Sequence, residues 1–123
     1  MSRVLVVEDS ESIQLMLKMR LEISGHEVLT AADGIEALEV LDSLSEAERP
    51  EVILLDAVMP RLDGLGFLKG FKTSGYYVPV IVVSAQLDLG PAPEWDMTYA
   101  TMSKPIDFTD LLQQIEAAAS QSD

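Results

Sequence analysis

The stretch Val52–Gly64 reads V-I-L-L-D-A-V-M-P-R-L-D-G: four apolar residues, an aspartate and then a turn. The apolar run is too short for a comfortable helix and lies between Pro50 and Pro60, so it is typical of a strand buried on both faces, as in parallel sheets. Asp56 then stands at the carboxyl end of this strand. In open α/β sheets that end borders the crevice where ligands bind, which makes Asp56 a candidate for chemistry. From this stretch alone, an aspartate that caps a loop is an equally good interpretation.

The rest of the chain alternates between segments with the composition of strands and segments with the periodicity of helices. The predicted strands are Val4–Val7, Glu27–Thr30, Val52–Leu55, Pro79–Val83 and Met97–Ser103. Amphipathic helices are predicted over 13–23, 35–44, 65–72 and 108–119. This alternation predicts a parallel sheet with right-handed crossovers and helices on both faces.

The composition of the strands predicts their order in the sheet. The first, third and fourth strands are wholly apolar and should lie inside, whereas the second and fifth are mixed and should lie at the edges. The expected order is therefore 2-1-3-4-5, with its switch point between the first and third strands. The segment Gln86–Thr98 should hold a fourth helix, but Gly90, Pro91 and Pro93 interrupt it, so we expect that helix to be short or distorted.

Length and composition limit the class of protein. The 123 residues and an apolar content of 48% suit one domain, 1–123, with a core of its own. The chain has no cysteine, which is compatible with a reducing cytoplasm, and its first apolar run is too short for a signal peptide or a membrane span. We therefore expect a soluble, cytoplasmic protein without membrane insertion.

The chain is strongly acidic, with 21 acidic and 8 basic residues and a formal net charge of −13. Such a chain is repelled by phosphate backbones, so direct binding to nucleic acid is not expected. A basic protein surface, or a metal cation gathered by clustered carboxylates, is the electrostatically natural partner.

Ionisable and hydroxyl side chains collect where the strands end: Glu8, Asp9, Asp56, Ser84 and Lys104. Three carboxylates this close repel one another by on the order of 1 to 3 kcal/mol per pair, so a cation should sit among them. Mg²⁺ characteristically takes one or two carboxylates together with waters and phosphate oxygens. With Mg²⁺ and the Lys104 ammonium neutralising a phosphoryl group, Asp56 could act as a nucleophile and form an acyl phosphate.

Other chemistries lack their motifs. The sequence contains no P-loop, GxGxxG, HExxH or GxSxG pattern, so nucleotide binding and triad hydrolysis have no support. The single histidine, His26, lies in a predicted turn with no visible partner. We interpret it as a surface residue rather than a ligand.

Four motifs in order, V-L-V-V-E-D-S, L-L-D-A-V-M-P-R-L-D-G, V-V-S-A and S-K-P, resemble the receiver domain of two-component response regulators. The resemblance spans the whole chain, and it implies the flavodoxin-like (CheY-like) fold. It also implies that Asp56 accepts a phosphoryl group from a histidine kinase or a histidine phosphotransfer protein. The implied Mg²⁺ ligands are Asp9, Glu8, Asp56 and the backbone carbonyl of Val58.

The resemblance assigns the remaining site residues as well. Ser84 matches the hydroxyl residue that bonds the phosphoryl oxygen, and Lys104 matches the lysine of the family. The bond Lys104–Pro105 is commonly cis in such domains. The family's aromatic switch residue is replaced by Thr101, and Tyr99 is expected on the opposite side, so we expect the signal to leave through the loop after Ser84.

The leading hypothesis is a phosphorylation-controlled switch, a monomer or weak dimer, that docks on a downstream protein and is not a turnover enzyme. Two alternatives remain. One is an interaction module that keeps the receiver fold but works without phosphate. The other is a small aspartyl-phosphate phosphatase, which would need an additional acid beside its nucleophile, and Val58 cannot serve as one.

Overall fold

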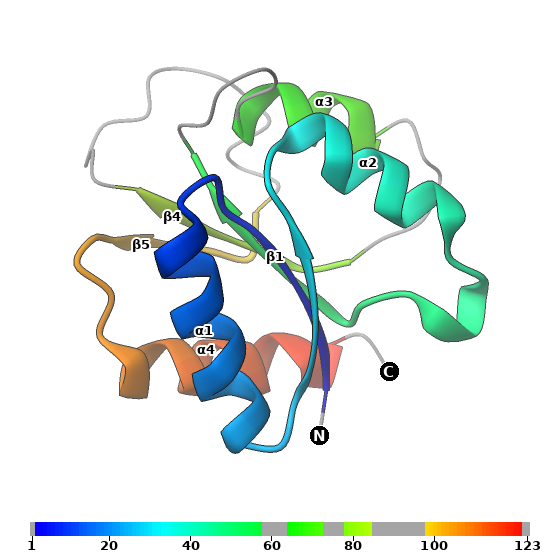
Figure 1. The fold of residues 1–123 in the computed structure, drawn as a ribbon. Helices are drawn as coiled ribbons and strands as arrows, with labels where there is room; N and C mark the ends of the chain where they lie inside the picture. Colours follow the sequence, from blue (N-terminus) through cyan, green and yellow to red (C-terminus); the bar gives the residue numbers. More distant parts are fainter. Residues whose placement is uncertain (1, 58–63, 73–77, 85–97, 122–123) are drawn as a thin grey trace.

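The computed structural model describes residues 2–57, 64–72, 78–84 and 98–121 (Figure 1). Five strands are present: β1 (Arg3–Val7), β2 (Glu27–Ala31), β3 (Val52–Asp56), β4 (Val80–Ser84) and β5 (Ala100–Ser103). The helices are α1 (Glu11–Ile23), α2 (Gly34–Ser43), a short 3₁₀ turn η1 (Glu46–Glu48), α3 (Gly64–Lys72) and α4 (Phe108–Gln121). The predicted elements are thus confirmed within the described residues, with ends displaced by at most a few positions.

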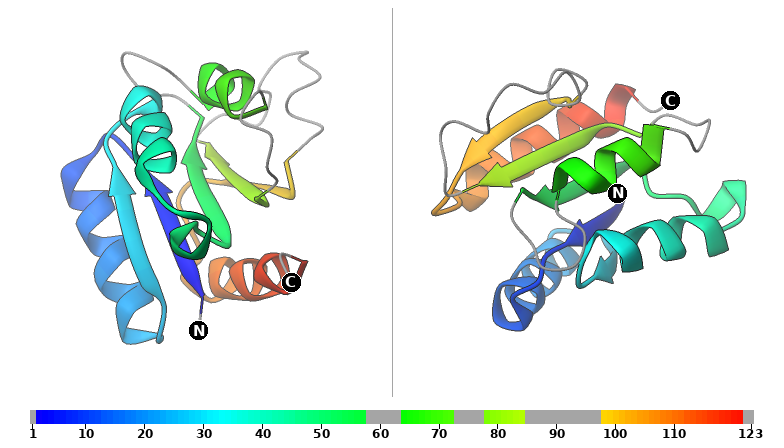
Figure 2. Two further views of the ribbon diagram at one scale, coloured as in Figure 1. Left: turned by 90° about the vertical axis from the view of Figure 1, so that its right-hand side faces the viewer. Right: turned by 90° about the horizontal axis from the view of Figure 1, so that it is seen from above.

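The five strands form one parallel sheet in the order β2-β1-β3-β4-β5, as predicted. Val7 at the end of β1 is in register with Ala31 of β2 and with Leu55 of β3. Figure 2 shows β4 and β5 running side by side in the same direction at the other end of the sheet. The apolar strands lie inside and the mixed strands at the edges, so the switch point falls between β1 and β3.

Two hydrophobic clusters fill the two sides of the sheet. Ile53 and Leu55 of β3 belong to the cluster beneath α2 and α3, and Leu54 of the same strand belongs to the cluster beneath α1 and α4. Figure 1 shows the two helix pairs on opposite sides of the strands. Because side chains alternate along a strand, a strand that helices cover on both faces is buried along its whole length, as β3 is. Its residues before Asp56 are accordingly all apolar.

Side-chain caps define where the helices start. Ser10 caps α1, because its hydroxyl accepts a hydrogen bond from the Ile13 N–H at 3.4 Å. Asp33 caps α2 in the same way, and Asp107 accepts from the Asp110 N–H in the first turn of α4. Gly25, which follows α1, has a φ of 95°, a value that suits glycine.

Helix α1 is less deeply packed than its sequence suggested. It buries only Leu17 and Leu21. Its exposed large apolar side chains are Leu15, Met16, Met19 and Ile23. The helix contacts the sheet with one narrow stripe, so much of its apolar surface faces solvent.

The prediction that His26 is a surface residue is wrong. Its side chain is buried, and its Nδ1 accepts a hydrogen bond from the Ser2 N–H at 3.2 Å. The chain turns at Gly25 and enters β2 beside the start of β1, which brings the imidazole against the N-terminal residues. His26 therefore ties the first residues of the chain to the sheet.

Two sequence predictions concern residues outside the described ranges: the interrupted segment Gln86–Thr98, of which only Thr98 is described, and the expected route of the signal after Ser84. Thr101 is exposed on β5, whereas Tyr99 packs with Met102 against the cluster beneath α1 and α4, so the two lie on opposite sides as expected. Within the described ranges, no helix has both the length and the apolar character needed to cross a bilayer.

Candidate functional site

The predicted site residues are positioned by the carboxyl ends of four neighbouring strands. Asp56 is the last residue of β3 and Ser84 the last residue of β4. Glu8 directly follows β1, and its N–H donates to the carbonyl of Ala31 at 3.0 Å. Lys104 directly follows β5, and its N–H donates to the carbonyl of Ser84 at 2.8 Å. The strand ladder thus fixes where each side chain leaves the backbone.

The three carboxylates meet as predicted. Glu8, Asp9 and Asp56 each place one oxygen so that the three oxygens lie within 4.8 Å of one another. The Lys104 ammonium lies 3.4 Å from Oδ2 of Asp56 and 3.7 Å from Oε2 of Glu8. Its distance to Asp56 also satisfies a hydrogen bond. Lys104 therefore forms ion pairs with both Glu8 and Asp56. With Asp9 included, the cluster carries a net negative charge.

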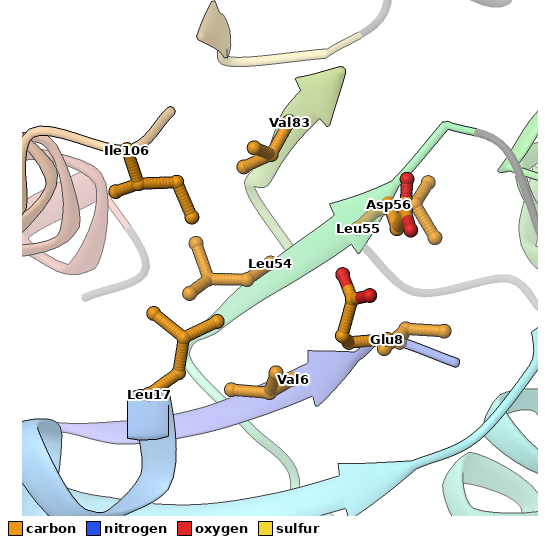
Figure 3. Close-up of a pocket in the computed structure, with 9 residues that line it drawn as sticks. Val6, Glu8, Leu17, Leu54, Leu55, Asp56, Val83 and Ile106 are labelled. Carbon is orange, nitrogen blue, oxygen red and sulfur yellow. The ribbon is translucent and has the colours of Figure 1, made fainter. Parts of the chain in front are cut away.

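Glu8 and Asp56 are buried, each with only 5% of its surface exposed, whereas Asp9 is exposed. A cavity of about 10 Å³ adjoins the two buried acids, and its other walls include the side chains of Leu17, Leu54 and Ile106 (Figure 3). Such a volume holds about one water molecule, and the walls give that water few polar partners. The two carboxylates therefore have little contact with solvent.

This environment changes the acidity of Glu8. Burial, and after it the negative charge of the neighbouring Asp56 carboxylate, raise the pKa of the Glu8 carboxyl from 4.5 to about 7. The Ser10 N–H, which donates to Oε1 of Glu8 at 3.2 Å, and the Lys104 ammonium act in the opposite direction without cancelling the rise. Without a metal ion, Glu8 is therefore partly protonated at neutral pH.

The raised pKa of Glu8 predicts how stability depends on pH in the presence of a chelator. Between pH 4.5 and about 7 the folded protein keeps a proton that the unfolded chain has released. The free energy of unfolding should therefore fall as the pH rises through this window, by on the order of 3 kcal/mol from this group. The Glu8→Gln variant should lack this fall. Urea unfolding of the parent and the variant between pH 4.5 and 8 measures the difference. Parallel pH profiles for the two proteins would show that Glu8 titrates normally.

The remaining predicted residues fit the same site to different degrees. Ser84 is buried and lies one residue beyond Val83, the register partner of Asp56 on the neighbouring strand. Val58, predicted to offer its carbonyl to the metal, lies outside the described residues. Sequence reasoning missed Gln14, whose side chain contacts the turn that carries Glu8. Its place in a regular polar pattern along α1 gave no signal of this role.

Comparison with known proteins assigns the family. The family model described as "Response regulator receiver domain" matches residues 4–116. The chain belongs to the response regulator receiver domain family. The receiver domain is 39% identical over 84 residues to the alkaline phosphatase synthesis transcriptional regulatory protein PhoP of Bacillus subtilis, a match over 68% of this chain and 33% of that protein. It is 38% identical over 84 residues to the response regulator MprA of Mycobacterium ulcerans, over 68% of this chain and 34% of MprA.

Solved structures agree with this assignment. A Francisella response regulator receiver domain superposes with a TM-score of 0.88 at 26% identity over the full length of both chains. The response regulator TrrA of Thermotoga maritima, solved in complex with Mg²⁺ and BeF, gives a TM-score of 0.84 at 25% identity over 96% of this chain and 99% of that one. The receiver domain spans about a third of the length of the curated relatives that it matches.

Proposed function

We propose that this receiver domain is a Mg²⁺-dependent phosphoacceptor in which Asp56 takes a phosphoryl group from a histidine kinase or a histidine phosphotransfer protein. One observation carries the proposal. The buried Asp56 carboxylate lies 3.4 Å from the Lys104 ammonium and within a cluster of three acids. Three neighbouring carboxylates with one shared lysine repel one another and destabilise the fold, so such a cluster points to a bound ligand. A phosphoryl group with its cation matches the site, because the cation pairs with the acids and the phosphoryl group with the lysine.

The donor atoms of the site suit Mg²⁺. Glu8, Asp9 and Asp56 supply carboxylate oxygens, which are the ligands that this hard cation prefers. When bound, Mg²⁺ would withdraw charge from the phosphoryl oxygens and relieve the repulsion among the acids. Asp9 is the most accessible of the three, so we assign it as a direct ligand, with Glu8 as the second acid.

The chain's own groups account for the transfer. A carboxylate oxygen of Asp56 attacks phosphorus, the bond between phosphorus and the donor's nitrogen breaks, and the donor imidazole leaves with the electron pair. The Lys104 ammonium is assigned to pair with a phosphoryl oxygen, and the Ser84 hydroxyl to donate a hydrogen bond to another. The product is an acyl phosphate on Asp56.

The proposed partners are proteins. The net charge of −13 disfavours direct contact with nucleic acid, although PhoP is by name a transcriptional regulatory protein. Helix α1 starts just after Asp9 and exposes the apolar side chains of Leu15 and Met16 near that end, so a protein that delivers a phosphoryl group to Asp56 would meet this surface. We propose that the phosphorylated domain then docks on a downstream protein, in the cytoplasm, and that it does not turn over a substrate as an enzyme does.

The proposal is tested by incubating the domain with acetyl phosphate and Mg²⁺ and measuring its intact mass. One phosphoryl group should add about 80 Da. The adduct should be absent when a chelator replaces Mg²⁺. A domain that never gains this mass under conditions that phosphorylate a known receiver domain would contradict the proposal.

Mg²⁺ should also stabilise the fold. A ligand that binds only the native state raises the free energy of unfolding by RT ln(1 + [L]/Kd), which is about 1.4 kcal/mol at ten times Kd. Asp9→Asn should lose most of this gain, while its stability without metal should equal or exceed that of the parent because one repelling charge is gone. Thermal melts of both proteins with and without millimolar Mg²⁺ measure the difference. An unmoved melting curve of the parent would rule out the assigned metal ligands.

A further inference from the structure

The acidic turn that follows β1 is held by a side chain from α1. Gln14 donates from its amide nitrogen Nε2 to the backbone carbonyl of Glu8 at 3.1 Å and to that of Ala31, the last residue of β2, at 3.2 Å. A side-chain amide carries two hydrogens, so both bonds can form at once. Gln14 therefore links α1 to the carboxyl ends of β1 and β2, next to the acidic site.

The first of these bonds acts on the peptide group that joins two candidate metal ligands. The carbonyl of Glu8 and the N–H of Asp9 lie in one rigid plane, because the peptide bond does not rotate. Fixing that carbonyl fixes the direction in which the Asp9 backbone continues. Asp9 is exposed, so its carboxylate is aimed by its backbone rather than by surrounding side chains.

Other bonds hold the same turn from the side of α1. The Ser10 N–H donates to Oε1 of Glu8, and the Ser10 carbonyl accepts from the backbone N–H of Gln14 at 2.9 Å. The Gln14 side chain adds the attachment to β2. The Ala31 carbonyl accepts both from Gln14 and from the Glu8 N–H, so one oxygen anchors the Glu8 backbone and also the side chain that holds the Glu8 carbonyl.

We propose that Gln14 is a positioning residue for the metal and phosphoryl site, because its amide locks the peptide between Glu8 and Asp9 and so aims their carboxylates. This inference rests on the proposed function. Outer partners that orient metal ligands typically change metal affinity by 10- to 100-fold when they are removed. Gln14→Met keeps the length and the helix propensity of the side chain but removes both donors.

The test is a titration of the folded domain with MgCl₂. NMR monitors the titration through the chemical shifts of the backbone amides of Glu8, Asp9 and Ser10. Gln14→Met should raise the Kd for Mg²⁺ about tenfold, and phosphorylation by acetyl phosphate should slow accordingly at subsaturating Mg²⁺. Gln113→Met, the same change at an exposed position on α4, should leave both quantities at the parent's values. A purely structural role would lower the melting temperature of Gln14→Met but leave its Kd unchanged.

The outcomes separate the two proposals. A parent that binds Mg²⁺ and a Gln14→Met variant with the same Kd would overturn the positioning role alone. A parent without saturable shifts would overturn the proposed function, and the positioning role with it. If Gln14→Met does not give a native spectrum, Gln14→Asn is used instead, because its amide is one methylene shorter and cannot reach both carbonyls; the same rise in Kd is then expected.

Discussion

Asp56→Asn is expected to take up no phosphoryl group from acetyl phosphate or from a phosphorylated histidine protein. The amide keeps the size of the carboxylate but lacks the anionic oxygen that attacks phosphorus. The variant should fold, because it replaces one of three acids whose oxygens lie within 4.8 Å of one another. Without metal it should be at least as stable as the parent, since it removes a buried, repelling charge.

Intact mass measured over a time course checks this expectation, with the parent as the positive control. A melting temperature of Asp56→Asn at or above that of the parent would show that the variant is folded, so that a loss of labelling is due to the missing carboxylate. Labelling of the variant at a rate near that of the parent would mean that another residue is the acceptor. The exposed Asp9 would then be the first alternative to consider.

Lys104→Met is expected to slow phosphorylation by roughly 100-fold, the typical cost of removing one preorganised group from a developing charge. The Lys104 ammonium is shared between Asp56 at 3.4 Å and Glu8 at 3.7 Å, and three-quarters of its side chain is shielded from solvent, with 25% exposed. Methionine retains much of the aliphatic stem but carries no charge. Rates at saturating Mg²⁺ isolate the effect on the transfer from any effect on metal binding.

Lys104→Arg is the matched control, because it keeps the charge but spreads it over a planar fork of donors. It should recover part of the rate, whereas Lys104→Met should not. Equal rates for the parent and for both variants would mean that Lys104 neutralises the acids of the resting site and has no part in the transfer.

Most of the fold could be predicted because local composition and burial agree. The wholly apolar runs at β1, β3 and β4 favour the inside of a parallel sheet and leave β2 and β5 for its edges, as observed. The depth of packing could not be predicted. The periodicity of α1 does not show how narrow its contact with the sheet is, and Ile23 is 83% exposed although the pattern allows it to be buried. The burial of His26 depends on where the turn at Gly25 places it relative to the N-terminal residues, a tertiary feature.

The gathering of the site residues could be predicted for a related reason: parallel strands bring their carboxyl ends to one edge. Glu8, Asp56 and Lys104 therefore meet as their positions after the strands implied. The raised pKa of Glu8 could not be predicted, because it depends on apolar walls contributed by α1 and by the segment after β5. Gln14 was also hidden, since a polar residue on a helix has the same pattern whether it faces solvent or two backbone carbonyls.

Chemical identification of the phosphorylated residue tests the central claim most directly. The domain is incubated with acetyl phosphate and Mg²⁺, reduced with borohydride, which converts an aspartyl phosphate to homoserine, and digested for peptide mass spectrometry. We expect homoserine at position 56 in the sample with Mg²⁺ and none in the sample with a chelator. Homoserine at the position of another aspartate would contradict the account. So would a phosphorylated protein in which position 56 is still aspartate in every molecule after reduction.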